Sequence, residues 1–130
     1  MDLSLTESQE MLKTATRGLV EREFTKESLI ELDLSDTSFA SEGWNRIQQS
    51  GWAGMLIPEH YGGAGASFSD AAVVAQELGR GPVPGPFFGS AILGVLTILE
   101  TGSEDQLEGL LPKVASGEII LGIAISEPHY

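Results

Sequence analysis

A hydroxyl and a carboxylate follow the most apolar run near the end of the chain. Residues 119–125 are all apolar or glycine, and Ser126, Glu127 and Pro128 come directly after them. Because a short apolar run rich in isoleucine and closed by proline is typical of a buried strand, we expect a β-strand over residues 119–125. Its outgoing end could offer backbone N–H groups and the Ser126 hydroxyl to a flat ligand. From these residues alone, an ordinary core strand explains the pattern better.

Two other patterns suggest binding chemistry, and neither is specific. Residues 62–65 contain three glycines, but no Lys-Ser/Thr pair follows as in a phosphate-binding loop. A tight structural loop is the better interpretation. His60 has one histidine companion in the chain, His129, so a histidine metal site has little support. Next to Glu59, His60 is better explained as an exposed loop residue than as a general base.

Composition narrows the classes of function. The chain has 130 residues, of which 42% are hydrophobic and 20% charged, as in an ordinary globular domain. A net charge of −12 argues against nucleic acid as a partner, because neutralising phosphates requires clustered Lys and Arg. The chain contains no cysteine, which excludes disulfides. The first residues lack the basic start of a signal peptide, so we expect a cytoplasmic protein.

Hydrophobic periodicity predicts helices that would position these residues. We expect helices over residues 4–24, 41–50, 67–78, 87–99 and 103–116. Ser4 or Thr6 would cap the first helix, and Ser67 or Ser69 the third. Residues 23–36 hold acids around one lysine and are expected to form an exposed loop, and Pro112 to kink or shorten its helix. The predicted fold is an all-α bundle of about six helices with one C-terminal β-strand.

The helix expected over residues 87–99 has no charged residue and is apolar on almost every side. It is too short to cross a bilayer, which needs about 20 residues. It is therefore either the core of the bundle or the wall of an apolar pocket. Composition alone favours the core.

Five motifs occur in a distinctive order and spacing. They are Ile57–Gly65 (IPEHYGGAG), Glu77–Gly81 (ELGRG), Gly102–Gln106 (GSEDQ), Leu111–Glu118 (LPKVASGE) and Ala124–Pro128 (AISEP). Together they resemble the acyl-CoA dehydrogenases, with residues 1–118 matching the N-terminal helical domain. Residues 119–130 would then begin an incomplete middle β-domain.

The resemblance implies an FAD-dependent enzyme that introduces a double bond between the α and β carbons of an acyl-CoA thioester. In such enzymes the strand ending in Thr/Ser–Glu–Pro lies along the flavin. The Ser126 hydroxyl would hydrogen-bond the pyrimidine side of the ring, while Ile123, Ala124 and Ile125 would supply backbone and apolar contacts. Fixed hydrogen-bond donors at the pyrimidine side of the flavin stabilise the negative charge that the ring carries after reduction.

The resemblance also bears on the uncharged helix, whose residues Phe87, Phe88, Ser90 and Ala91 would lie nearest an acyl pocket. Plain core remains an equal alternative. The connection over residues 81–87 looks like that of bacterial members that act on bulky, ring-bearing thioesters and sometimes pair two unlike subunits. Expected partners are the acyl-CoA substrate, an electron-transfer flavoprotein or similar acceptor, and further subunits of the same or another kind.

The sequence departs from the family pattern at its end. The chain stops at Tyr130, and His129–Tyr130 stand where a glycine-containing turn usually begins. The part of the family that carries the catalytic carboxylate is absent, so no residue here is assigned as the base. We expect an N-terminal portion of a longer enzyme, which alone binds FAD poorly. Two alternatives remain, a non-catalytic subunit of a hetero-oligomeric dehydrogenase and a helical interaction module without a redox role.

Overall fold

The computed structural model describes residues 4–34, 41–81 and 83–126. These contain six α-helices, two short 3-10 helices and one π-helix, which confirms an all-α bundle of about six helices. The α-helices are α1 (Glu7–Glu23), α2 (Lys26–Asp33), α3 (Ser41–Gln49), α4 (Phe68–Arg80), α5 (Val95–Thr101) and α6 (Glu104–Ala115). The 3-10 helices are η1 (Trp52–Gly54) and η2 (Glu59–Tyr61), and the π-helix is η3 (Phe87–Gly94).

Local capping explains where three of these helices begin. Thr6, Ser67 and Ser103 each accept a hydrogen bond from a backbone N–H three residues later, and that later side chain bonds back to the cap. These capping boxes satisfy N–H groups that the first helical turn leaves free. Of the two caps considered for each of the first and third predicted helices, Thr6 and Ser67 are the ones used. The Ser41 side chain lies outside the described residues.

Two sequence expectations were wrong, and a third was tested only in part. Residues 26–33 form helix α2, capped by Thr25, rather than a loop; α2 buries no residue, so no apolar stripe announces it. Pro112 does not shorten α6, which continues to Ala115, and a kink at Pro112 stays a prediction. No β-strand forms among the described residues, 119–126 included. A strand requires a neighbouring strand for its ladder, and the described part of the chain offers none.

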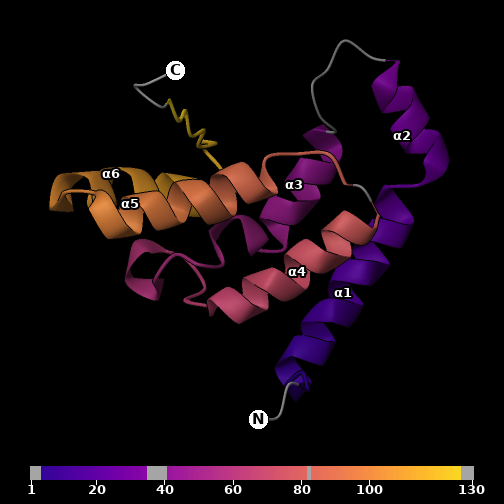
Figure 1. Ribbon diagram of the computed structural model, residues 1–130, viewed down its shortest axis with the longest axis horizontal. Coiled ribbons are helices and arrows are strands. Elements are labelled where there is room, and N and C mark those ends of the chain that lie inside the picture. Colours follow the sequence, from indigo (N-terminus) through magenta and orange to yellow (C-terminus); the bar gives the residue numbers. More distant parts are fainter. Residues whose placement is uncertain (1–3, 35–40, 82, 127–130) are drawn as a thin grey trace.

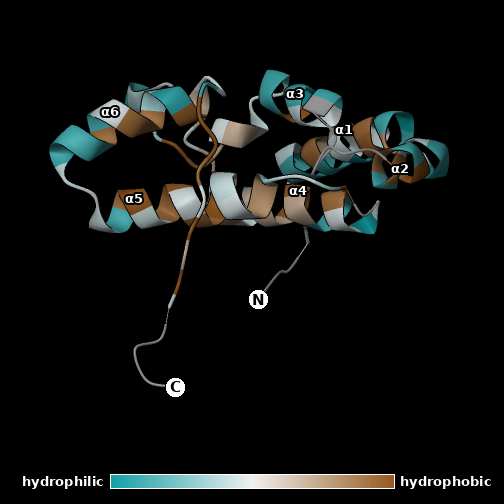
Figure 2. Cartoon of the chain, turned by 90° about the horizontal axis from the view of Figure 1, so that it is seen from above, coloured by the Kyte–Doolittle hydropathy of each residue, from teal (hydrophilic) through white to brown (hydrophobic). Residues whose placement is uncertain are grey.

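The helices pack in two groups that η1 and η3 connect. Helix α4 lies along α1, and α5 lies along α6 (Figure 1). The π-helix η3 contacts both α4 and α5, and the turn η1 contacts α3, α6 and η3, so both groups share one core. Viewed from above, residues 119–126 form an extended segment that first passes along the helices and then leads away from them (Figure 2).

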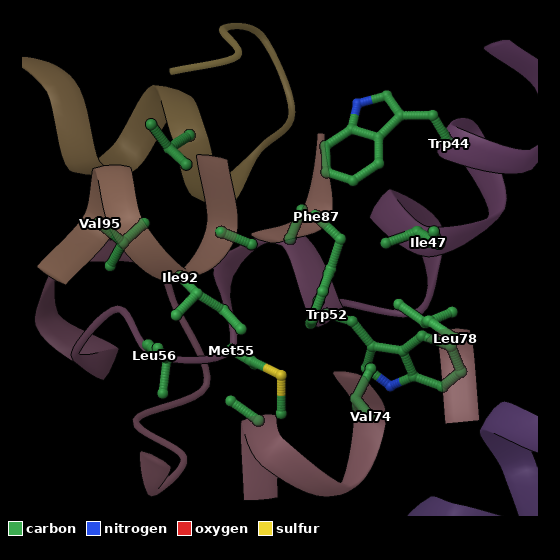
Figure 3. Close-up of a cluster of buried hydrophobic side chains, with 14 of the residues drawn as sticks. Trp44, Ile47, Trp52, Met55, Leu56, Val74, Leu78, Phe87, Ile92 and Val95 are labelled. Carbon is green, nitrogen blue, oxygen red and sulfur yellow. The ribbon is translucent and has the colours of Figure 1, made fainter. Parts of the chain in front are cut away.

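The core is a continuous cluster to which α3, η1, α4 and η3 all contribute (Figure 3). Trp44 and Ile47 come from α3, Trp52 from η1, and Phe87 from η3. Ile57, Val74, Val95 and Leu111 are completely buried. Because each such aliphatic side chain contributes about 2 kcal/mol through burial, this cluster holds η3 firmly against η1 and α4.

Candidate functional site

An apolar pocket opens between α3, α4 and the start of η3. Its volume is about 220 Å³, and it is lined by Ile47, Ala75, Leu78, Gly79, Val83, Pro84, Gly85, Phe87 and Phe88. No lining side chain is charged, so the pocket suits a hydrocarbon group rather than a polar one. The segment over residues 83–86 forms one side and turns through Gly85, whose φ of 148° favours glycine.

The two phenylalanines of η3 take different positions in this pocket. Phe87 is buried, with 6% of its surface exposed, and belongs to the core (Figure 3). Phe88 is 61% exposed at the pocket's edge. One ring therefore forms a rigid wall, while the other is free to contact whatever enters.

The other two residues proposed for the acyl wall lie deeper. Ala91 is 1% exposed and packs in the core cluster. Ser90 is 2% exposed, and its Oγ accepts a hydrogen bond of 3.0 Å from the Leu121 N–H. The structure thus brings Phe87 and Phe88 together at the pocket, whereas Ser90 and Ala91 are buried and do not line it. Whether all four face a substrate stays a prediction.

Residues 122–126, which include the four residues expected to contact flavin, are exposed. Ile123 is 37% exposed and Ile125 85%, and Ala124 and Ser126 are also exposed. Within the described chain, no hydrogen bond occupies the backbone N–H groups of these residues. The segment thus presents apolar side chains and unused backbone donors, and its contact with flavin stays a prediction. Glu127 and Pro128 lie outside the described residues.

The glycine loop does not present donors to a phosphate. The N–H groups of Gly63, Ala64 and Gly65 donate to the carbonyls of Pro58, Gly54 and Ile57, at 3.3, 3.2 and 2.9 Å. Because these donors are used within the loop, it is the tight structural element that the sequence favoured. His60 is exposed and stacks obliquely on Tyr61, with ring centroids 4.1 Å apart. Among the described residues, no group of acids or histidines could hold a metal ion.

A buried ion pair lies between α1 and α4, and its residues do not line the pocket. Glu77 is the one carboxylate buried in the described part of the chain, with 2% of its surface exposed. Arg17 donates two hydrogen bonds of 2.9 Å to it, and Arg80 lies 3.5 Å away. The hydrogen bonds from Arg17 hold the pKa of Glu77 below its usual value. Sequence reasoning placed Glu77 in a motif but missed this pairing, which joins residues 60 positions apart.

A second carboxylate with a lowered pKa, that of Asp70, lies in the first turn of α4. The Ser67 hydroxyl and then Gln9 donate hydrogen bonds to Asp70, which lower the pKa of that carboxyl. Gln9 belongs to α1, so this contact ties α1 to the start of α4. A shallow pocket of about 350 Å³ lies beside it, with Leu12, Trp52 and Met55 in its lining.

None of the helices that the structure describes is both long and apolar enough to cross a membrane.

Comparison with known proteins relates this geometry to a family. Residues 6–118 match the model for "Acyl-CoA dehydrogenase, N-terminal domain". The acyl-CoA dehydrogenase IpdE2 of Mycobacterium tuberculosis is 34% identical over 125 residues, which is 95% of this chain. The chain spans 38% of the length of that relative.

Solved structures share the arrangement of the helices. The ChsE4–ChsE5 complex from Mycobacterium tuberculosis contains a chain that matches 94% of this one, with a TM-score of 0.86 and 27% identity; the match covers 34% of that chain. An acyl-CoA dehydrogenase complexed with FAD from Bacillus anthracis matches 96% of this chain, with a TM-score of 0.81 and 25% identity, and 21% of that chain is covered.

Proposed function

This chain belongs to the acyl-CoA dehydrogenase family, and from that premise we propose that it is the N-terminal part of an FAD-dependent dehydrogenase. The reaction would introduce a double bond between the α and β carbons of an acyl-CoA thioester. One observation carries the proposal: a single helix, η3, lines an apolar pocket with Phe87 and Phe88 and holds the exposed segment of residues 122–126 through Ser90. A pocket for a tail and a surface for a flat ring thus share one element.

The pocket would receive the acyl tail. Phe88, exposed at its edge, is placed to contact the tail, and the buried ring of Phe87 forms the wall. Ser90 and Ala91, which follow in η3 and are buried, would support this wall without lining the pocket itself. A volume of about 220 Å³ is below the range of about 300–1,000 Å³ typical of complete small-molecule sites, so further parts of the enzyme would complete the pocket.

The exposed segment would lie against the flavin. Ile123, Ala124 and Ile125 would cover the ring with backbone and apolar groups, and the Ser126 hydroxyl would donate to its pyrimidine edge. The chemistry that bound FAD supplies in this proposal is acceptance of a hydride from the β-carbon. Residues 119–130 would then begin the middle domain, after a helical domain over residues 1–118.

No catalytic base is assigned to this chain. A general base works best when its pKa lies near the operating pH. Glu77 fails this requirement, because Arg17 holds its pKa low and both of its oxygens are engaged. Its burial between α1 and α4 also keeps it from the pocket. The carboxylate that removes the α-proton would come from another part of the enzyme.

The proposed partners follow from the same reaction. Reduced flavin requires an acceptor, for which an electron-transfer flavoprotein is the proposed class. We also propose an oligomer, and the likeness to the ChsE4–ChsE5 complex supports one built from unlike subunits. That likeness favours a second candidate function, in which this chain is a non-catalytic subunit beside a partner that holds the flavin. A cytoplasmic location stays a prediction.

The test is to express the complete reading frame that encodes this chain and to purify the product. Its visible spectrum reports bound flavin, and anaerobic addition of acyl-CoA thioesters of different tail sizes reports reduction of that flavin. Bleaching of the flavin absorbance by at least one thioester is expected. A product that contains no flavin, and gains none from a co-expressed partner subunit, would overturn both candidate functions and leave a helical interaction module.

A further inference from the structure

We infer that Ser90, Gly94 and Leu121 form a clasp that sets the position of residues 122–126, with Ser90 and Gly94 as positioning residues. This inference rests on the proposed function, because it assigns these residues a role in aligning the segment that would contact the flavin. It differs from the acyl-wall role, since it concerns the side of η3 that faces the C-terminal segment.

The polar half of the clasp is the bond between Ser90 and Leu121. The Ser90 Oγ accepts the Leu121 N–H at 3.0 Å, and Ser90 is 2% exposed. The preceding hydrogen bond along the backbone is from the Ile119 N–H to the Lys113 carbonyl, at 3.3 Å. Beyond it, the Ser90 bond is the one hydrogen bond that holds the described residues 120–126. The segment is therefore anchored at one point, directly before it becomes exposed.

The steric half is the close approach of Leu121 to Gly94. A Cβ placed on Gly94 would lie 2.6 Å from the Leu121 Cβ and 2.9 Å from its Cδ1. Real Cβ atoms do not approach so closely, so Leu121 can lie here because residue 94 has no side chain. Leu121 is half-buried and packs against the core cluster.

The two halves act on one residue from two directions. The hydrogen bond fixes the backbone of Leu121, while the contact with Gly94 fixes its side chain. Successive side chains of an extended segment point to opposite sides. Fixing residue 121 therefore determines on which side of the segment each side chain of residues 122–126 lies. A shift by one residue would exchange the two faces, so the clasp sets which face of the segment is presented.

The chain provides a matched control within the same helix. Gly89 also lies in η3, but a Cβ there would meet nothing within 4 Å. Gly89→Ala and Gly94→Ala thus make the same chemical change to one helix, and one of them collides with Leu121. Ser90→Ala removes the hydroxyl and leaves the backbone intact.

The first measurement is amide hydrogen exchange in this chain. Without its acceptor, the Leu121 amide in Ser90→Ala should exchange about tenfold faster, as expected for loss of one part-buried hydrogen bond. Gly94→Ala should also accelerate that amide, because the added methyl displaces Leu121. Gly89→Ala should leave it unchanged, and the amides of α1 should stay protected in all variants, which shows that the bundle is folded. Unchanged exchange at Leu121 in Ser90→Ala and Gly94→Ala would overturn the clasp.

The second measurement uses the complete flavin-bound enzyme. Ser90→Ala and Gly94→Ala should change the flavin absorbance spectrum and shift the midpoint potential, whereas Gly89→Ala should match the wild type. A purely structural role would not move the potential, so equal potentials in all variants would overturn positioning even if exchange at Leu121 is faster. Wild-type protein that holds no flavin would overturn the proposed function and the positioning role with it. The exchange result reports on the clasp independently of that outcome.

Discussion

The guanidinium of Arg17 donates two hydrogen bonds to the carboxylate of Glu77, from Nε to Oε2 and from Nη2 to Oε1. Arg17 comes from α1 and Glu77 from α4, so this ion pair joins the two helices that pack most extensively against each other. Arg17 is partly exposed and Glu77 is buried. The asymmetry makes the carboxylate the costly partner to leave unpaired, because burial without compensation destabilises a charge.

Glu77→Gln should lower the free energy of unfolding by about 2 kcal/mol, through loss of charge-assisted hydrogen bonds in a buried place. Urea unfolding followed by circular dichroism measures this. The control is Glu10→Gln, which breaks the exposed pair with Lys13 at 3.5 Å and should cost less than about 0.5 kcal/mol. If the two variants lost the same free energy of unfolding, the buried pair would contribute no more to stability than the exposed pair, which contradicts the prediction.

The same pair should make stability depend on pH in the acid range. The pKa of Glu77 is below its ordinary value of 4.5 in the folded protein. As the pH falls below that ordinary value, the unfolded chain takes up a proton that the folded chain does not. The free energy of unfolding therefore decreases as the pH falls, until the pH is below the lowered pKa of Glu77. The contribution of Glu77 to stability is complete above about pH 6.

Unfolding of wild type and Glu77→Gln over a series of pH values checks this dependence. The difference in free energy between them should be constant near neutrality and should shrink on acidification. Asp70, whose pKa is also lowered, remains in both proteins and so cancels in the difference. Parallel profiles throughout the acid range would contradict the assignment.

Gly63→Ala should destabilise the chain by about 3 kcal/mol through steric overlap. A Cβ at this position would contact the Ile57 carbonyl oxygen and lie 2.6 Å from the Gly54 carbonyl oxygen. Backbone atoms cannot move aside as a flexible side chain can. Gly109→Ala in α6 is the control: nothing lies within 4 Å of its Cβ, so it should stabilise the helix by about 0.5–1 kcal/mol. In thermal unfolding, the midpoint temperature of Gly63→Ala should lie below that of the wild type, and the midpoint temperature of Gly109→Ala should lie above it.

Phe88→Ala should weaken binding of long-tailed thioesters in the complete enzyme without reducing stability. Phe88 is 61% exposed, so little of its area is buried in the fold, yet it lies at the pocket's edge. We expect KM for long-tailed substrates to rise about tenfold, as for loss of roughly 1.4 kcal/mol of apolar contact. Phe68 is equally exposed but lies at the start of α4, outside the pocket lining, so Phe68→Ala should leave KM unchanged. Equal effects of the two variants would remove Phe88 from the acyl site.

The parts of the fold that sequence could predict are those that short-range chemistry determines. The caps Thr6, Ser67 and Ser103 act on residues three positions away, so their signatures are visible in a few letters. The absence of charge from Phe87 to Leu99 indicated either core or pocket, and Phe87 and Phe88 at the pocket support both interpretations. Family resemblance, carried by motifs along the whole chain, predicted the all-α bundle.

What sequence could not predict depends on distant partners or on weak patterns. Arg17 and Glu77 are 60 residues apart, and Ser90 and Leu121 are 31 apart, so only packing brings each pair together. Helix α2 has no fully buried residue and packs on the core through half-buried Leu29, so it lacks the strong apolar stripe on which recognition depends. The π-helical turn of η3 was also missed, because in a uniformly apolar stretch no change of period marks it.

The widened turn of η3 has a consequence for how such a protein can diversify. A π-helix closes its rings with bonds to the fifth residue, so inserting or deleting one residue within 87–94 would rotate the remainder of the helix about its axis. Pocket residues lie at the start of these eight positions, and the contact with Leu121 comes from their end. Lineages that remodel this helix by insertion or deletion to admit a different tail must therefore also readjust residue 94 or 121, so substrate preference and these contacts should evolve in concert.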